Sequence, residues 1–292
     1  MDFQEKELIK IIVPKEKHWV GDGFHVSSIF SMHSEDYKNI SPFILLDHAS
    51  PKYFPSTKIK LGVGEHPHRG FETVTFAISG EVEHRDSAGG GGTIKTGGIQ
   101  WMTAGKGVLH DEFHSRKFAQ EGGEFEMIQL WVNLPSNFKM TNPRYQSFDD
   151  TDFPIIYKNK GKLKIKIIAG CLETALSPVK TFTKINIFEI SSNENFKYKI
   201  PFSKGSNTLL FQILGETYFN HSIIQKGNLA IFSQNGSVLN FNIGYDSKFL
   251  IFNGEPIDEP IEAYGPFVMN TKQEILEAIQ DFQEGKMGNL VD

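Results

Sequence analysis

The sequence predicts an all-β protein built from two β-barrels in series, with one short α-helix near its C-terminal end. Nearly every segment reads as a short run of alternating apolar and polar residues, bounded by Gly, Asn, Asp or Pro. Helical periodicity is almost absent before residue 270. The chain has 292 residues, which exceeds the usual size of one domain, so two domains are expected.

The clearest expected strands recur at intervals that suit a barrel or a sandwich. They cover residues 73–78, 125–134, 163–169, 184–190, 208–214, 237–241 and 248–252. The C-terminal stretch differs, because Asn270 is the predicted N-cap of a helix that ends at Gly285. The helix is predicted from Gln273 at the capping-box position and from one apolar face, formed by Ile275, Leu276, Ile279 and Phe282.

The boundary between the two domains is expected in residues 142–154, which contain two prolines and three closely spaced aspartates and show no period of their own. Nine of the ten histidines lie at or before His114. We therefore expect an N-terminal metal-binding domain over residues 1–141. A C-terminal domain without metal ligands, ending in the helix, is expected over residues 142–292.

The bulk composition excludes several classes of function. A formal net charge of −5 argues against direct nucleic-acid binding, which depends on clustered Lys and Arg. No apolar run is long enough to span a membrane, and the N-terminal MDFQEKELIK lacks the apolar stretch of a secretory signal, so a cytoplasmic protein is expected. The single cysteine, Cys171, permits no internal disulfide, and its apolar strand context predicts a buried structural thiol.

Two pairs of residues predict a metal site. His66 and His68 are two residues apart, and His110 and Glu112 repeat that spacing about forty residues later. Since residues two apart on a strand share a face, each pair can direct both donors to one point, and two such strands can form a four-ligand cup. Three imidazoles and one carboxylate favour a hard to borderline divalent ion, and an octahedral ion would keep open positions for water or substrate.

The same segments resemble the pirin family of the cupin superfamily. The resemblance is carried by HPHRGFETVTFAISGEVEHRDSAG, by GGIQWMTAGKGVLHDEF, by QLWVNLP and by the tail GPFVMNTKQEILEAIQDFQEGKMG. It implies a bicupin of two tandem jelly-roll β-barrels whose N-terminal barrel holds a single iron. The pirin ligand pattern falls on His66, His68, His110 and Glu112, with Fe(II) as the expected ion and Cu, Ni, Mn and Zn as alternatives.

Glu72 is the rival fourth ligand, because many cupins take a glutamate four residues after the histidine that corresponds to His68. Along one strand Glu72 would point to the same face as His68, so the period alone does not separate it from Glu112. The alternative role for Glu72 is to orient an imidazole through its other nitrogen.

Other residues near the predicted site have two interpretations each. His114 is expected past the strand end in solvent, with contact to the metal as the alternative. Asp47 and His48 form either a pair behind the ligands or a strand-end turn. The glycine-rich residues 84–98 are expected to form a long hairpin tip that could act as a lid. The aromatic and apolar residues are expected mainly in the core, although they could line a pocket for a flat substrate: Phe43, Phe76, Trp101, Met127 and Trp131.

The resemblance implies flavonol (quercetin) 2,4-dioxygenase activity, in which a flavonol-like substrate and O2 react at Fe(II). Glu112 would be both ligand and general base, and therefore the catalytic residue. The competing expectation is a non-catalytic, iron-dependent redox sensor that binds transcription factors or metabolic enzymes. We expect a monomer that contacts no membrane. A cavity that holds a two- or three-ring ligand beside the metal would favour the enzyme.

Overall fold

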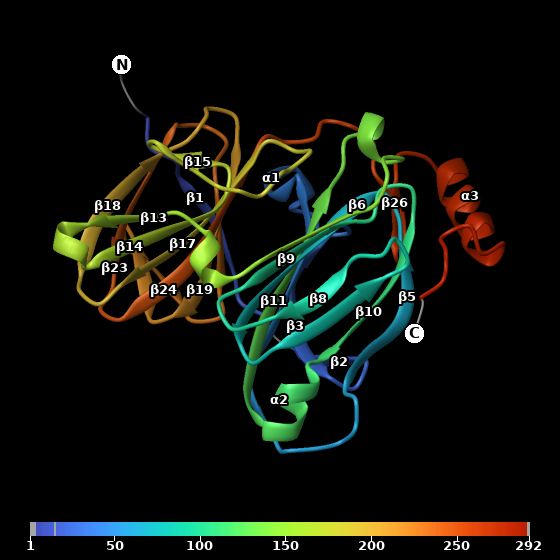
Figure 1. The fold of residues 1–292 in the computed structure, drawn as a ribbon. Helices are drawn as coiled ribbons and strands as arrows, with labels where there is room; N and C mark the ends of the chain where they lie inside the picture. Colours follow the sequence, from blue (N-terminus) through green and yellow to red (C-terminus); the bar gives the residue numbers. More distant parts are fainter. Residues whose placement is uncertain (1–3, 15, 291–292) are drawn as a thin grey trace. The chain divides into compact units, whose positions relative to one another are not determined.

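The computed structural model describes residues 4–14 and 16–290 and divides into two compact units (Figure 1). The histidine-rich unit comprises Lys15–Met32, Phe43–Asp150 and Ile257–Asp292, and the histidine-poor unit comprises Met1–Pro14, His33–Pro42 and Thr151–Pro256. The segments of the two units therefore interleave along the chain. The expected single boundary between residues 141 and 142 stays a prediction. By contacts, the first strand (Leu8–Ile12) groups with the histidine-poor unit and the last helix (Lys272–Gln283) groups with the histidine-rich unit, whereas a single cut would place each of them in the other unit.

The histidine-rich unit is a sandwich of two antiparallel sheets (Figure 1). The larger sheet has the order β12-β9-β6-β11-β4-β3-β2 and is formed by β2 (His18–Val20), β3 (Phe24–Ser31), β4 (Phe43–Phe54), β6 (Phe71–Ser79), β9 (Ile99–Thr103), β11 (Gly123–Asn133) and β12 (Arg144–Phe148). The smaller sheet has the order β5-β10-β7-β8 and is formed by β5 (Gly62–His68), β10 (Val108–His114), β7 (Val82–Asp86) and β8 (Gly91–Ile94). The candidate site lies on the smaller sheet.

The histidine-poor unit repeats this arrangement of a seven-stranded and a four-stranded sheet. Its larger sheet has the order β1-β22-β19-β24-β17-β14-β13 and is formed by β1 (Leu8–Ile12), β13 (Ile155–Lys158), β14 (Leu163–Ala169), β17 (Ile185–Ser192), β19 (Asn207–Leu214), β22 (Leu229–Phe232) and β24 (Ser247–Gly254). Its smaller sheet has the order β18-β23-β20-β21 and is formed by β18 (Phe196–Pro201), β20 (Glu216–Phe219), β21 (Ser222–Gln225) and β23 (Val238–Ile243). The all-β expectation is confirmed.

Each unit has an apolar core of its own, because alternate residues of its strands face the interior of the sandwich. In the histidine-rich unit the core gathers Phe24, Phe54, Phe118 and Phe125. In the histidine-poor unit it gathers eighteen buried residues from Leu163 to Ile251. Phenylalanines therefore contribute to the cores of both sandwiches.

The remaining elements are short helices, turns and two-stranded pairs. They are α1 (Tyr37–Ile40), α2 (Arg116–Glu121), α3 (Lys272–Gln283), the 3-10 turns η1 (Ser136–Phe138), η2 (Asp150–Asp152) and η3 (Asn159–Gly161), and the two-stranded pairs β15 (Cys171–Leu172) with β16 (Ala175–Leu176) and β25 (Glu262–Tyr264) with β26 (Phe267–Met269). None of the described helices combines the length and apolar character that a membrane crossing requires.

Three local expectations need correction. The N-cap of α3 is Thr271 with Glu274 as its capping-box partner, one residue later than expected, since this pair satisfies both backbone amides. Cys171 is exposed rather than buried, because it opens the short β15 at the edge of a two-stranded pair. Residues 142–154 are not an irregular linker, since β12 within them pairs with β9.

Candidate metal centre

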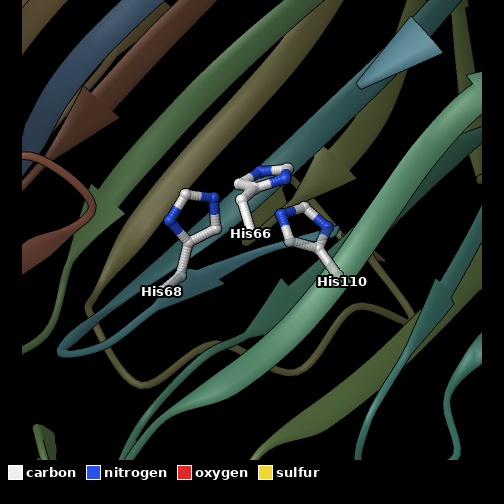
Figure 2. A group of neighbouring side chains, drawn as sticks. All are labelled: His66, His68 and His110. Carbon is white, nitrogen blue, oxygen red and sulfur yellow. The ribbon is translucent and has the colours of Figure 1, made fainter. Parts of the chain in front are cut away.

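Three histidine rings converge on the inner face of the smaller sheet (Figure 2). β5 and β10 are antiparallel neighbours in which His66 lies opposite His110 and His68 lies opposite Val108. The two-residue period therefore places all three imidazoles on one face. The ring centroids are 4.2 Å apart for His66 and His110, 4.8 Å for His68 and His110, and 4.9 Å for His66 and His68. One nitrogen of each ring lies within 4.8 Å of the others.

The chemistry of these rings fits a divalent cation. His68 and His110 are almost completely buried, and among the described residues His68 Nδ1 and His110 Nε2 have no hydrogen-bond partner. Burial, followed by the neighbouring imidazoles, holds the pKa of both rings well below its usual range, so they are neutral near pH 7. His66 Nδ1 lies 2.8 Å from the Gly64 carbonyl oxygen and so carries its proton there, which leaves Nε2 with a lone pair.

Glu112 lies beside this cluster, two residues after His110 on β10, but belongs to a second group. Its carboxylate and one nitrogen each of His84 and His110 lie within 4.8 Å of one another. Glu112 Oε1 accepts hydrogen bonds from Thr75 Oγ1 at 3.1 Å and from Gln100 Nε2, which turn the carboxylate toward the larger sheet. The structure thus brings His66, His68 and His110 together and joins Glu112 to them through His110.

His84 also belongs to this site, and its position there was not predicted from the sequence. It lies on β7 opposite Glu112, is buried, and its ring stacks on Tyr145 of β12 with centroids 4.8 Å apart and an interplanar angle of 10°. The spacing of His84 and Asp86 was the available signal, since it repeats the two-residue period of the other pairs. Tyr145 lies in residues 142–154, where the sequence predicted a domain boundary, and no spacing in that segment indicated a role in the site.

Glu72 faces away from the cluster. Gly70, with φ of 87°, makes a turn between β5 and β6, so the expectation that Glu72 continues the strand of His68 is wrong. Glu72 and Thr75 lie on opposite faces of β6, and Glu72 Oε1 accepts a hydrogen bond from Thr103 Oγ1 at 2.6 Å. Burial raises the pKa of Glu72 to about 7.

His114 also lies elsewhere, and its expected place in solvent is wrong. The residue is the last of β10 and is 2% exposed. Its Nε2 donates to the Gly23 carbonyl oxygen at 3.0 Å, and its ring stacks on Phe125 with centroids 4.4 Å apart. Burial lowers its pKa to about 4, so His114 is a neutral part of the aromatic core.

A cavity of about 480 Å³ opens beside the histidines within the histidine-rich unit. Its polar wall is formed by His66, His68, Glu112, Asp47 and Gln129. The other lining residues are Val20, Phe24, Val26, Leu45, Val63, Met127, Trp131, Gly265 and Pro266. Of the five residues considered for a pocket, Met127 and Trp131 line it, while Phe43, Phe76 and Trp101 are buried and do not.

Asp47 and His48 are not a pair behind the ligands, because neighbouring strand residues point to opposite faces. Asp47 lines the cavity, where its Oδ1 accepts a hydrogen bond from Ser28 Oγ at 2.7 Å. Burial raises the pKa of this carboxyl. The His48 ring instead contacts Glu126 Oε1, at 2.8 Å from Nε2.

Two double-sheet β units, one of which places a histidine cluster beside an apolar cavity, define a two-domain cupin protein with a candidate metal centre. The family model described as Pirin matches residues 23–132, and the model described as Pirin C-terminal cupin domain matches residues 187–288. The chain belongs to the pirin family.

Similarity to known proteins extends over nearly the whole chain. A crystal structure titled quercetin 2,3-dioxygenase from Acinetobacter baumannii is 46% identical, with a TM-score of 0.94 over 99% of this chain and 100% of that chain. A Pseudomonas aeruginosa protein named "Putative quercetin 2,3-dioxygenase" is 41% identical over 96% of this chain and 98% of its own length. A pirin-like protein of Solanum lycopersicum is 36% identical over 92% of this chain and 88% of its own.

Proposed function

We propose that the protein is a metal-dependent dioxygenase that cleaves flavonols, with quercetin 2,4-dioxygenase activity, Fe(II) as cofactor and O2 as second substrate. The observation that carries the proposal is that His66, His68 and Glu112 line an apolar cavity of about 480 Å³. Such a volume lies within the range of pockets that bind small organic ligands. The names of the two quercetin dioxygenase relatives support the same class of substrate.

His66, His68 and His110 would hold the ion through neutral imidazole nitrogens, with Glu112 as the fourth ligand. When bound, Fe(II) supplies a Lewis acid for the substrate hydroxyl and the redox chemistry that O2 requires. The remaining work falls to the side chains of the chain itself.

Glu112 is the proposed general base. It is buried within the wall of the cavity and would take the proton from the 3-hydroxyl group of the flavonol. Thr75 and Gln100 donate to its Oε1 and fix the orientation of the carboxylate. The base therefore needs little rearrangement when the substrate arrives.

The cavity wall would orient the substrate and exclude water. Phe24, Met127 and Trp131 offer apolar surface to the flat rings of a flavonol. Asp47 and Gln129 are the other polar residues of the wall, and their oxygens can accept hydrogen bonds from phenolic hydroxyls. A polyhydroxylated aromatic compound matches both kinds of surface.

The cavity also favours the enzyme over the redox-sensing regulator, because a regulator whose metal only changes charge needs no chamber for a second molecule. A protein partner, a monomeric state and a cytoplasmic location stay predictions from the sequence.

The proposal is tested by loading the protein with Fe(II) or with redox-inert Zn(II) and adding quercetin under air. The iron form is expected to bleach quercetin, consume one O2 per quercetin and release carbon monoxide, whereas the zinc form is expected to do none of these. An iron-loaded protein that retains its metal and leaves quercetin and O2 unchanged would contradict the proposal.

A further inference from the structure

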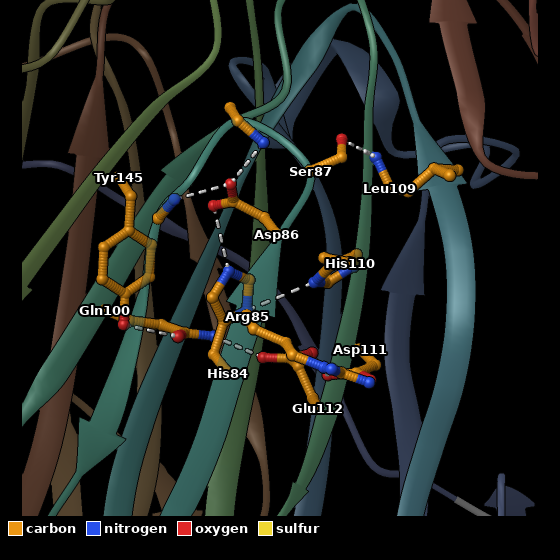
Figure 3. Close-up of polar contacts among 12 residues, drawn as sticks. His84, Arg85, Asp86, Ser87, Gln100, Leu109, His110, Asp111, Glu112 and Tyr145 are labelled. Carbon is orange, nitrogen blue, oxygen red and sulfur yellow. Dashed lines mark hydrogen bonds and ion pairs between the residues drawn. The ribbon is translucent and has the colours of Figure 1, made fainter. Parts of the chain in front are cut away.

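Next to the candidate metal site, three side chains form a continuous line of polar contacts (Figure 3). His110 Nδ1 lies 3.3 Å from His84 Nδ1, and His84 Nε2 lies 3.3 Å from Asp86 Oδ2. All three residues are buried. They lie on neighbouring strands, with Asp86 opposite His110 across the β10–β7 pair.

The acceptor at the end of this line determines where each proton lies. An ionised carboxylate only accepts, so His84 carries its proton on Nε2 and donates it to Asp86. His84 Nδ1 is then the acceptor, and His110 must donate from its own Nδ1. His110 is left with a lone pair on Nε2, the buried atom that has no partner among the described residues.

Asp86 is fixed as an anion at the far end. Its Oδ1 accepts from the backbone amides of Ala88 and Gly90, both at 2.9 Å. Burial acts to raise the pKa of Asp86, but the hydrogen bonds from His84 and from these amides outweigh it and leave the pKa below its ordinary value. The glycine-rich hairpin tip therefore anchors the carboxylate.

Tyr145 fixes the middle of the line. Its ring lies nearly parallel to the His84 ring, and its hydroxyl donates to Gln100 Oε1 at 3.3 Å. Since Gln100 in turn donates to Glu112, the residues that hold His84 and the residues that hold the proposed base meet in one network.

We propose that Asp86 and His84 are positioning residues that fix the tautomer and orientation of His110, so that its Nε2 is presented to the metal. The proposal rests on the proposed metal site and makes no use of the substrate. Carboxylates that hydrogen bond to a metal-binding histidine raise its basicity, and their loss commonly reduces metal affinity by about 10- to 100-fold. Here the carboxylate would act through a second imidazole.

The sharpest variant is Asp86→Asn. The asparagine oxygen would keep accepting the hydrogen bonds of the Ala88 and Gly90 amides, so the NH2 group of the asparagine would face His84 Nε2 as a donor. His84 would then carry its proton on Nδ1, so two N–H groups would face each other where His84 Nδ1 meets His110 Nδ1. His110 can relieve this conflict only by moving its own proton to Nε2, the nitrogen that the metal requires.

Two further variants and a control complete the series. His84→Leu removes the hydrogen bonds that connect His110 to Asp86. His84→Gln can accept a hydrogen bond from His110 through its oxygen and donate one to Asp86 through its nitrogen, so we expect it to retain part of the metal affinity. Arg85→Gln is the control, because Arg85 lies between the two residues on the opposite face of β7 and pairs with Asp111.

The experiment measures the Zn²⁺ affinity of the full chain by chelator competition, and the histidine tautomers of the metal-free protein by ¹⁵N NMR. Asp86→Asn and His84→Leu are expected to lower affinity by about 10- to 100-fold, His84→Gln to lose less, and Arg85→Gln to stay within about twofold. The wild-type His110 signal should be protonated at Nδ1, and in Asp86→Asn it should be protonated at Nε2.

The outcomes separate the two proposals. If the wild type binds Zn²⁺ and neither variant changes the affinity or the His110 tautomer, the positioning role is overturned and the metal site stands. If His84→Gln loses as much affinity as His84→Leu, and zinc shifts the His84 signals as it shifts those of His110, His84 is itself a ligand and the positioning role is also overturned. A wild type without affinity for any divalent ion overturns both proposals.

Discussion

Replacing Glu112 with glutamine separates the chemical role of this residue from its shape. Glu112 Oε1 accepts hydrogen bonds from Thr75 and Gln100, and the side chain is 6% exposed. A glutamine of the same shape would keep these bonds by turning its oxygen toward Gln100 and its NH2 group toward the histidines. The NH2 group can neither bind a cation nor take a proton.

The expected loss follows from these roles. A general base contributes about 10²- to 10⁴-fold to a rate, which at 1.36 kcal/mol per tenfold corresponds to about 2.7 to 5.4 kcal/mol. We therefore expect kcat of the Glu112→Gln variant to fall by at least about 100-fold. Metal affinity should fall less, because the three histidines remain, and the fold should be retained because both hydrogen bonds have an acceptor.

The assay compares kcat for quercetin at full iron occupancy, checked by metal analysis of the same sample. Asp111→Asn is the matched control, since Asp111 is the neighbouring carboxylate, points to the other face of β10 and pairs with Arg85. Its kcat should stay within about twofold. A Glu112→Gln variant that retains more than about a hundredth of wild-type kcat at full occupancy would refute the role of Glu112 as base.

Three further substitutions give distinct expectations. His110→Ala should lose bound iron and turnover together, and iron retained at the wild-type level in metal analysis would show that His110 is no ligand. Glu72→Gln should retain metal and activity but change the pH dependence of the free energy of unfolding. Burial raises the pKa of Glu72 from an ordinary 4.5 to about 7, so the folded protein holds a proton that the unfolded chain has already lost between these two pH values. The stability of the wild type therefore falls by about 3 kcal/mol as the pH rises through this window. Urea unfolding at pH 5 and pH 7 should show a smaller fall for Glu72→Gln, and an equal fall would contradict the raised pKa. Asp47→Asn should raise KM several-fold for flavonols with many phenolic hydroxyls and leave it unchanged for those with few, whereas equal effects on both would exclude recognition of hydroxyls by Asp47.

The histidine cluster could be predicted from the sequence because it depends on local geometry. The two-residue period alone places His66 and His68 on one face, and the glycine-rich stretch before His110 suggested a hairpin that returns the chain. The all-β class followed from the same alternation. The C-terminal helix followed from its cap and its apolar residues, with an error of one residue at the N-cap. Its expected apolar face was partly wrong, since Leu276 and Phe282 are exposed while Ile275 and Ala278 are buried.

What the sequence could not provide depends on which strands become neighbours. His84 reaches His110 because β7 pairs with β10, and Tyr145 reaches His84 from the edge of the facing sheet. A period within one strand contains no information about either pairing. Glu72 was misplaced for the same reason, since a single turn at Gly70 transfers it to another strand and another sheet.

The most direct test of the account is a crystal structure of the iron-loaded protein with anomalous diffraction measured at the iron edge. We expect one anomalous peak in the histidine-rich unit, about 2.0–2.2 Å from a nitrogen of each of His66, His68 and His110 and from a Glu112 oxygen, with open positions toward the cavity. An iron peak away from these residues, or no peak there in a crystal whose metal content is stoichiometric, would contradict it.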